Sequence, residues 1–264
     1  MNVKITTLAW LGAAIAAGVM TLVFVFTPLD LIVASYFYDP VGPATWPVGS
    51  QMPWKFFNDE DDVLVIILAG IILTLLVAGL IKRRLRPLAV YAAFALVAVL
   101  VGPILVVNGI FKGMEIGDFY IGWARPRPRQ IIDFGGDERF YHLWEPAFMD
   151  GLRGTNSSFA SGHVSIGAIF IVIFFMFNNV DLIAKVINKT STAAINSIKA
   201  VKYGGLISSI VFSFMLSVGR ISAGAHFASD CMYAVIFVWT ATAAIYYWVF
   251  RIPRLERRVL EKAA

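Results

Sequence analysis

The sequence has 264 residues, of which 59% are hydrophobic and only 15% are charged. Soluble domains carry about a quarter charged residues, so this composition excludes an ordinary soluble globule. The formal net charge is +5, but the basic residues are not gathered in one polar domain, so no nucleic-acid partner is expected. A single cysteine, Cys231, excludes an intramolecular disulfide and a cysteine-based zinc site, and we expect it to be a packing residue.

Six segments of 17 to 25 residues contain no Asp, Glu, Lys or Arg. A hydrocarbon core about 30 Å thick is crossed by about 20 apolar residues in a helix. The sequence therefore predicts an all-α polytopic membrane protein with six transmembrane helices, forming one domain over residues 1–264. The first segment is expected to be a retained span rather than a signal peptide, because its uncharged stretch is too long. The predicted spans are 5–29, 63–81, 88–111, 164–180, 203–219 and 231–250.

Six spans put both termini on one side of the membrane, and 14 of the 22 lysines and arginines lie on that side. Positive residues concentrate in cytoplasmic segments, so both termini are expected in the cytoplasm. The two long outer segments are then 30–62 and 112–162. We expect an interfacial helix followed by an irregular loop in the first. Aromatic side chains at the level of the lipid headgroups are expected in the second.

Charged residues and histidines recur at the outer ends of the last four predicted spans, so the topology brings them to one membrane face. A single such residue often only anchors a helix end, but six titratable groups with a Ser-Gly-His motif predict a functional site over 112–230. The residues are Lys112, Arg125-Pro126, Ala160-Ser161-Gly162-His163, Gly219-Arg220, His226 and Asp230.

These residue types suit phosphoryl transfer. The cations Lys112, Arg125 and Arg220 are expected to neutralise a phosphate and its transition state. Ser161 offers a hydroxyl, and the amides of Ser161 and Gly162 lie where a helix begins, which favours an anion. Gly162 also lets the backbone approach the phosphate closely.

The histidines supply the remaining chemistry. His226 and Asp230 are four residues apart, so a carboxylate can orient the imidazole for attack on phosphorus. His163 is then the acid that protonates the leaving oxygen. Because no carboxylate cluster suits a magnesium or two-metal site, we expect a reaction without a metal or another cofactor.

At these motifs the sequence resembles the type 2 phosphatidic acid phosphatase superfamily, integral-membrane lipid phosphatases related to vanadium haloperoxidases. The family pattern is Lys then Arg-Pro, Pro-Ser-Gly-His, and Ser-Arg followed by spaced His and Asp. The resemblance implies that His226 forms a phosphohistidine, that Asp230 orients it, and that His163 is the general acid and then the base for water. It assigns phosphate binding to Lys112, Arg125, Ser161, Gly162 and Arg220.

Three positions depart from the family pattern. Twelve residues separate Lys112 from Arg125 where six are usual, and this spacing resembles the bacterial lipid A phosphatase branch. Ala160 replaces the motif proline, which removes rigidity but no chemical group. Gly219 replaces the motif serine, so one hydroxyl is missing.

Other residues have alternative interpretations. Arg127 and Arg129 alternate with prolines that stiffen the segment, which indicates a second anionic site, although pairing with nearby acidic residues or lipid headgroups explains them equally well. The acidic run 59–62 is expected to be a solvated turn. Pro103 is expected to kink the third span.

The sequence thus predicts a lipid phosphatase of the bacterial inner membrane with its active site facing the periplasm. Its partners are the bilayer and a phospholipid or lipid A substrate, with no obligate protein partner expected. Lipid A is preferred over phosphatidylglycerol phosphate and undecaprenyl diphosphate. A lipid phosphotransferase is an alternative, as is an anion-binding transporter, although the spans lack the midplane charges that a transporter predicts.

Overall fold

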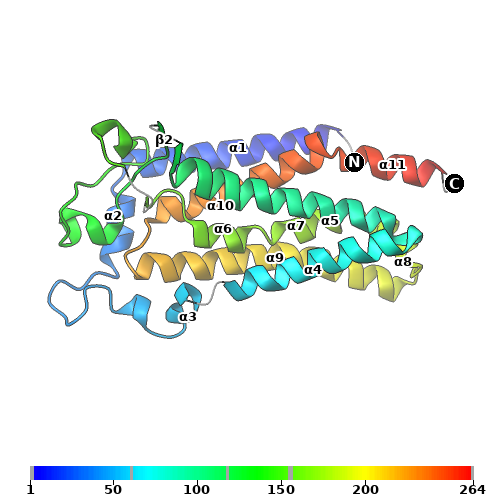
Figure 1. Ribbon diagram of the computed structural model, residues 1–264, viewed down its shortest axis with the longest axis horizontal. Coiled ribbons are helices and arrows are strands. Elements are labelled where there is room, and N and C mark those ends of the chain that lie inside the picture. The colour runs from blue at the N-terminus through cyan, green and yellow to red at the C-terminus, as the bar shows by residue number, and fades with distance from the viewer. Residues whose placement is uncertain (1–2, 60–61, 117–118, 154–156, 263–264) are drawn as a thin grey trace.

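The computed structural model describes residues 3–59, 62–116, 119–153 and 157–262, which form an elongated bundle of helices (Figure 1). Each of the six apolar segments is helical there, so the mainly helical prediction is confirmed. Three of the segments are built from two consecutive helices. The helices are α1 (Val3–Phe26), α4 (Asp62–Ile81), α5 (Arg86–Val99) with η3 (Leu100–Phe111), α6 (Gly162–Ala168) with α7 (Ile171–Met176), α9 (Thr192–Ser222), and α10 (Ala228–Ala244) with η7 (Ile245–Val249).

Three helices of the described chain are long and apolar enough to cross a membrane. Two bent pairs also qualify if each counts as one span: α1 with α2 (Leu29–Ser35), bent by 75°, and α6–α7 with α8 (Val180–Ile187), bent by 73°. The helix at Val65–Ile81 is apolar but shorter. Length and composition therefore support three to five spans, and six remains a prediction. The three single helices are Arg83–Phe111, Thr192–Ser222 and Ala228–Val249.

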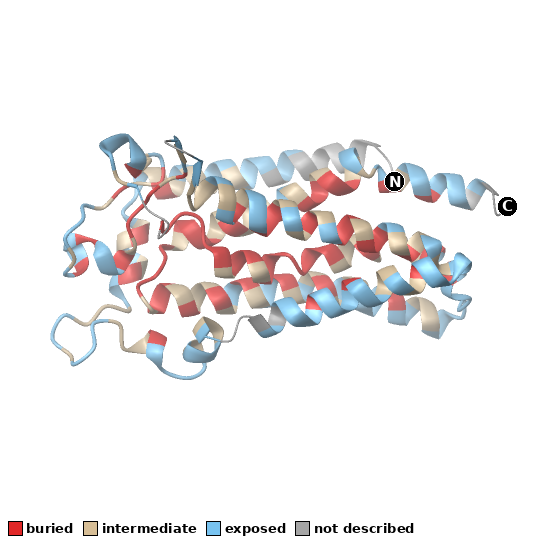
Figure 2. Ribbon diagram, viewed as in Figure 1, coloured by how far each residue is buried: buried red, intermediate tan, exposed pale blue. Residues whose placement is uncertain are grey.

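The outer surface of the bundle is apolar. Buried residues follow the inner helices α6, α7 and α10, whereas α4 and the part of α1 after residue 13 are exposed along much of their length (Figure 2). On α4, Ile66 is 69% exposed and Leu73 is 61% exposed. Exposed apolar helix faces of this extent are typical of contact with lipid.

The third apolar segment is α-helical over α5 and π-helical over η3, with Pro103 inside η3. Proline has no backbone N–H and cannot make the usual helical hydrogen bond, and a wider π turn accommodates that loss. The side chain of Asn108 donates to the Pro103 carbonyl at 2.8 Å. The feature expected as a kink is thus a change of helix type, which alters the face on which the last η3 residues lie.

The break between α6 and α7 is packed closely against α9. A β-carbon on Gly167 would lie 2.6 Å from the backbone nitrogen of Ser213, so only glycine allows this approach. The hydroxyl of Ser209 donates to the carbonyl of Ala168 at 2.7 Å. A carbonyl at an interrupted helix is therefore satisfied inside the apolar bundle, where leaving it unpaired would be costly.

The outer segments at one end of the bundle hold short elements (Figure 1). A two-stranded antiparallel hairpin is a small departure from the all-α prediction, with Glu115 opposite Tyr120. The acidic run expected as a turn lies partly outside the described residues, which omit 60–61. The elements are α2, η1 (Val48–Ser50), α3 (Trp54–Asp59), β1 (Met114–Ile116), β2 (Phe119–Ile121), η4 (Pro128–Gln130), η5 (Ile132–Phe134) and η6 (Ala147–Asp150).

Aromatic side chains fasten these outer segments to each other. Trp46 packs against Tyr38 and Phe134, with ring centroids 5.5 and 5.4 Å away. The Trp46 ring also covers Gly224 between α9 and α10, where a β-carbon would lie 2.3 Å from the ring and φ is +61°. The first outer segment therefore forms a packed cap over the loop between α9 and α10.

The opposite end of the bundle holds the basic segments: η2 (Arg83–Leu85), α8 and α11 (Ile252–Lys262) lie there with the beginning of α1 (Figure 1). A guanidinium nitrogen of Arg84 donates to the carbonyl of Lys185 at 3.3 Å. The segment between the second and third predicted spans therefore contacts the segment between the fourth and fifth. Both were predicted to lie on the cytoplasmic side.

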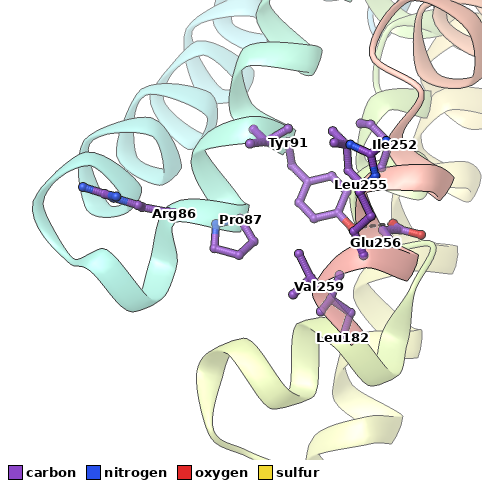
Figure 3. Close-up of a pocket in the computed structure, with 10 residues that line it drawn as sticks. Arg86, Pro87, Tyr91, Leu182, Ile252, Leu255, Glu256 and Val259 are labelled. Carbon is purple, nitrogen blue, oxygen red and sulfur yellow. Dashed lines mark hydrogen bonds between the residues drawn. The ribbon is translucent and has the colours of Figure 1, made fainter. Parts of the chain in front are cut away.

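A buried carboxylate, Glu256, fixes α11 at this end (Figure 3). It accepts hydrogen bonds from the hydroxyl of Tyr91 and, at 3.2 Å, from the side chain of Asn179. A mainly apolar pocket of about 280 Å³ lies beside it, with Leu182 and Val259 among its walls. This pocket is at the far end of the bundle from the residues of the predicted site.

Candidate active site

The end of η3 lies against the start of α6, which brings two predicted phosphate-binding residues together. A β-carbon on Gly162 would lie 3.3 Å from Lys112 Nζ and 2.5 Å from Asn108 Oδ1. Because the Asn108 side chain is tied to the Pro103 carbonyl, it has little freedom to move away. The absence of a side chain at Gly162 is therefore what gives the lysine ammonium its place beside the α6 backbone.

Ser161 is the N-cap of α6, and its hydroxyl oxygen accepts from the Val164 amide at 3.5 Å. Its own amide donates to the carbonyl of Asp230 at 3.2 Å, so the predicted amide contact with phosphate is already occupied. α6 has only seven residues, so a helix dipole contributes little here. The hydroxyl of Ser161 and the amide of Gly162 remain as the groups that an anion can use.

His226 lies in the loop between α9 and α10 and is fully buried. Its Nδ1 is 2.6 Å from the carbonyl oxygen of Ser158. A carbonyl can only accept, so Nδ1 carries the proton and Nε2 carries the lone pair. Among the described residues, Nε2 has no hydrogen-bond partner. The imidazole is thus held with its basic nitrogen available.

The surroundings keep this imidazole neutral. Burial, followed by the positive charges of Arg220, Lys112 and Arg127, holds the pKa of His226 well below its usual value of 6.5. A neutral imidazole at physiological pH is the form that can act as a nucleophile.

Asp230 supports His226 indirectly, which differs from the predicted direct contact. Its Oδ2 is 3.9 Å from His226 Nδ1, beyond hydrogen-bond range. The same oxygen accepts from the Ser158 hydroxyl at 2.5 Å and from the Phe227 amide at 2.7 Å. Asp230 therefore fixes the residue whose carbonyl holds the imidazole, and it fixes the backbone next to His226.

Arg125 is fully buried and has protein partners in place of the predicted phosphate. Its guanidinium makes ion pairs of 2.7 Å with Asp230 and 2.8 Å with Asp30. Its Nε donates to the Tyr141 carbonyl at 2.9 Å, and the guanidinium lies 4.4 Å from the centroid of the Phe227 ring. Burial opposes its charge, but the two carboxylates outweigh that effect and raise the pKa of Arg125.

Arg127, two residues further on, is less deeply buried than Arg125. The segment is pinned on both sides of Arg127: the Ser158 amide donates to the Arg125 carbonyl at 2.7 Å, and the Arg129 amide donates to the Gly224 carbonyl at 3.1 Å. Arg127 is half-buried. Burial, then the charges of Arg129 and Arg220, lower its pKa to about 10, so it stays charged at neutral pH.

Three cations therefore act on both predicted catalytic histidines. The charges that affect His226 are those of Arg220, Lys112 and Arg127, and the same three act on His163 at the start of α6. Two of them were predicted as phosphate ligands, and the third was assigned to a second anionic site. Arg129, the other residue of that predicted site, is exposed.

Arg139, another arginine of the outer loop, has an acidic partner. Arg139 forms an ion pair of 2.6 Å with Asp150, and both side chains are at least half exposed. This ion pair does not test the two interpretations of Arg127 and Arg129, which stay predictions.

Sequence reasoning missed four polar residues of the site. Ser158 and Ser229 precede recognisable motif residues by one to three positions but match no motif themselves. Asn108 lies one helical turn before Lys112, and its polarity inside an apolar span was a usable signal. Asp30 begins an outer segment far from the motifs, so nothing in the sequence connected it to them.

An apolar groove of about 470 Å³ runs between α4, the continuous helix of α5 and η3, and α6. Its walls come from residues such as Ile72, Leu96 and Ile166, and Asn108 is the polar residue among those lining it. Since Asn108 also borders Gly162, the groove leads to the edge of the site. In the part of the chain that the structure describes, no three His, Cys, Asp or Glu side chains form a group suited to a metal ion.

Apolar helices with two histidines and three cations at one end are typical of integral-membrane proteins that carry a polar site at the end of a helix bundle. The model of the PAP2 superfamily matches residues 92–254, so the chain belongs to this superfamily. The resemblance seen in the motifs is thereby confirmed.

Three curated relatives are each named lipid A 4'-phosphatase. The protein of Francisella tularensis subsp. novicida (strain U112) is 30% identical over 159 residues, which cover 60% of this chain and 58% of the relative. The protein of Rhizobium leguminosarum is 28% identical over 153 residues, covering 58% and 50%. The protein of Rhizobium etli is 28% identical over 150 residues, covering 56% and 44%. The chain thus spans about half the length of these relatives, and no solved structure matches it.

Proposed function

We propose that this protein is a bacterial membrane lipid phosphatase that removes a phosphate from a lipid headgroup, with lipid A as the preferred substrate. The observation that carries the proposal is a buried, neutral His226 whose Nε2 is available beside three cations. Family membership and the names of the three relatives support the same chemistry and the same lipid.

In the proposed reaction, the negative charge of the bound phosphate offsets the three cations and stabilises the protonated form of His163. Nε2 of His226 attacks phosphorus while His163 donates its proton to the departing lipid oxygen. The bond between phosphorus and that oxygen breaks, which leaves a phosphohistidine and a lipid alcohol. His163, now neutral, takes a proton from water, whose oxygen attacks phosphorus. The bond between phosphorus and Nε2 of His226 breaks, inorganic phosphate leaves, and both histidines return to their starting forms. Each step of this route is carried by protein groups and water, without a metal.

The phosphate is proposed to lie between Lys112, Arg127 and Arg220. These side chains balance its charge and that of the transition state, while the Ser161 hydroxyl and the Gly162 amide donate to its oxygens. Arg125 acts through Asp230 rather than on the phosphate, because its guanidinium is buried and bound by two carboxylates.

The hydrocarbon part of the substrate is proposed to lie in the groove between α4, the continuous helix of α5 and η3, and α6, which Asn108 joins to the site. Six spans with both termini in the cytoplasm would put this site at the periplasmic face of the inner membrane. The gathering of basic segments at the opposite end supports that orientation.

The test is release of inorganic phosphate by detergent-purified protein in excess EDTA, from lipid A, phosphatidylglycerol phosphate and undecaprenyl diphosphate in parallel. Release from lipid A that survives EDTA and disappears in His226→Ala supports the proposal. Release that EDTA abolishes would rule out the metal-free route. Phosphate release from one of the other two lipids, without release from lipid A, would show that lipid A is not the substrate and would identify the lipid that is.

The test also separates the alternatives from other classes. If no lipid loses phosphate to water, an acceptor lipid is added, and transfer to it would identify a phosphotransferase. Anion uptake by proteoliposomes without any transfer would favour a transporter.

A further inference from the structure

Asp30 is a buried carboxylate for which the reaction above has no role. It lies in the first turn of α2 and is 3% exposed. It is also outside the region matched by the superfamily, residues 92–254. Burying a carboxylate is costly unless hydrogen bonds and opposite charge compensate for the lost water, so its partners indicate its purpose.

The hydrogen bonds of the Asp30 side chain, within the described chain, go to the two loops that build the site. Its Oδ2 accepts from Arg125 Nη2 at 2.8 Å and from the Ser229 hydroxyl at 2.5 Å. Its Oδ1 accepts from the Ser229 amide at 2.9 Å. Asp30 therefore joins α2 to both the arginine segment and the start of α10.

From Asp30 a continuous series of hydrogen bonds reaches the nucleophile. Arg125 Nη1 donates to Asp230 Oδ1 at 2.7 Å, and the Ser158 hydroxyl donates to the other oxygen of Asp230 at 2.5 Å. The Ser158 carbonyl then accepts the proton of His226 Nδ1 at 2.6 Å. Each member is buried, so water is a poor substitute for a lost partner.

The guanidinium of Arg125 is held between the carboxylates of Asp30 and Asp230, and the balance between these two attractions sets its position. If Asp30 lost its charge, Arg125 would be drawn toward Asp230 alone. That shift would compete with Ser158 for the Asp230 carboxylate and loosen the carbonyl that orients His226.

We propose that Asp30 is a positioning residue that holds His226 in its reactive tautomer through Arg125, Asp230 and Ser158. This inference rests on the proposed function, in which His226 is the nucleophile. Since Asp30 contacts none of the groups assigned to the phosphate, it affects the rate of the chemical step and not the binding of substrate.

The experiment compares kcat and KM of Asp30→Asn with those of the wild type and of a matched control, Asp39→Asn. Asp39 caps a turn in the same outer segment through the amides of Val41 and Gly42. Losing an outer partner of a catalytic group typically costs about 10- to 100-fold, so Asp30→Asn should lower kcat by that factor with KM nearly unchanged. Asp39→Asn should match the wild type.

Two further variants separate positioning from mere folding. Ser229→Ala removes the hydroxyl that bridges Arg125 and Asp30 without changing any charge, so it should lower kcat in the same direction but less. In an Arg125→Gln background, Asp30→Asn should cause little further loss, because the residue through which it acts is already gone.

A readout independent of turnover keeps this inference distinct from the proposed function. The nitrogen-15 spectrum of histidine-labelled protein, with the signal assigned from His226→Gln, reports which imidazole nitrogen carries the proton. The wild type should show the Nδ1–H tautomer, and Asp30→Asn should show a mixture. If the wild type releases no phosphate, the proposed function fails while the spectrum still tests the link.

Several results would overturn the proposal. One is a folded Asp30→Asn with wild-type kcat, and another is a rise in KM at constant kcat. A full additional loss in the Arg125→Gln background, or an unchanged tautomer in Asp30→Asn, would also refute it. If Asp30→Asn does not fold, wild-type kcat in Ser229→Ala would count against it in the same way.

Discussion

Substituting Gly162 by alanine tests the contact on which the phosphate site depends. The added carbon would lie 2.5 Å from Asn108 Oδ1 and 3.3 Å from Lys112 Nζ. Asn108 is tied to the Pro103 carbonyl at 2.8 Å, so relief requires a shift of the lysine or of α6. Overpacking of this kind costs about 1–3 kcal/mol. If the strain is expressed at the site, kcat/KM for lipid phosphate release falls about 5- to 150-fold.

The assay measures initial rates of phosphate release by the wild type, Gly162→Ala, Asn108→Ala, the double variant and one control. Gly204→Ala is the matched control, because no atom lies within 4 Å of its new carbon, and it should keep the wild-type rate. The double variant should recover part of the loss. Wild-type activity in Gly162→Ala would refute the close packing at this site. A loss that Asn108→Ala does not relieve would show that Asn108 is not the obstacle.

Three other predictions concern pH, lipid and stability. Arg127→Gln removes a positive charge that disfavours the protonated form of His226, so the pKa of His226 should rise. The fall of kcat/KM on the acid side of its pH profile should therefore begin at higher pH. An unshifted pH profile would contradict the electrostatic role of Arg127. Ile72→Phe narrows the apolar groove. It should reduce kcat/KM severalfold for a long-chain lipid phosphate but not for a dioctanoyl lipid phosphate. Equal losses for both substrates would argue against the groove as the hydrocarbon site. Tyr91→Phe removes a hydrogen bond to buried Glu256, which contributes about 1 kcal/mol to stability. The midpoint temperature of thermal unfolding should therefore fall by about 2–4 °C while kcat/KM stays constant.

Local sequence features predicted much of the fold because their causes are local. Uncharged stretches become helices since a lipid-facing backbone must satisfy its own hydrogen bonds, and α1, α9 and α10 follow that rule. The interruption between α6 and α7 was not predictable in the same way. It depends on Gly167 and Ser209 meeting across two helices that are distant in the sequence.

The candidate site shows the same division. The motifs identified His226, His163, Lys112 and Arg220, because histidines and cations at span ends are conspicuous against an apolar background. The motif predicted that Arg125 binds the phosphate, whereas the structure buries its guanidinium between the carboxylates of Asp30 and Asp230. Arg125 and Arg127, separated by one proline, look alike in the sequence, and the structure distinguishes them because Arg125 is fully buried and Arg127 only half-buried.

The sequence by itself predicted that the protein lies in a membrane, on which side of the membrane each loop is expected, and which kind of chemistry its motifs suit. Composition and spacing decide these properties, and they do not require knowledge of which distant residues touch. The tertiary structure decided which charged side chains are buried against one another, as Arg125 is between Asp30 and Asp230, and which are not. Asp30 joins the network only because α2 folds back over the start of α10, and that contact arises from packing between segments that no local pattern connects.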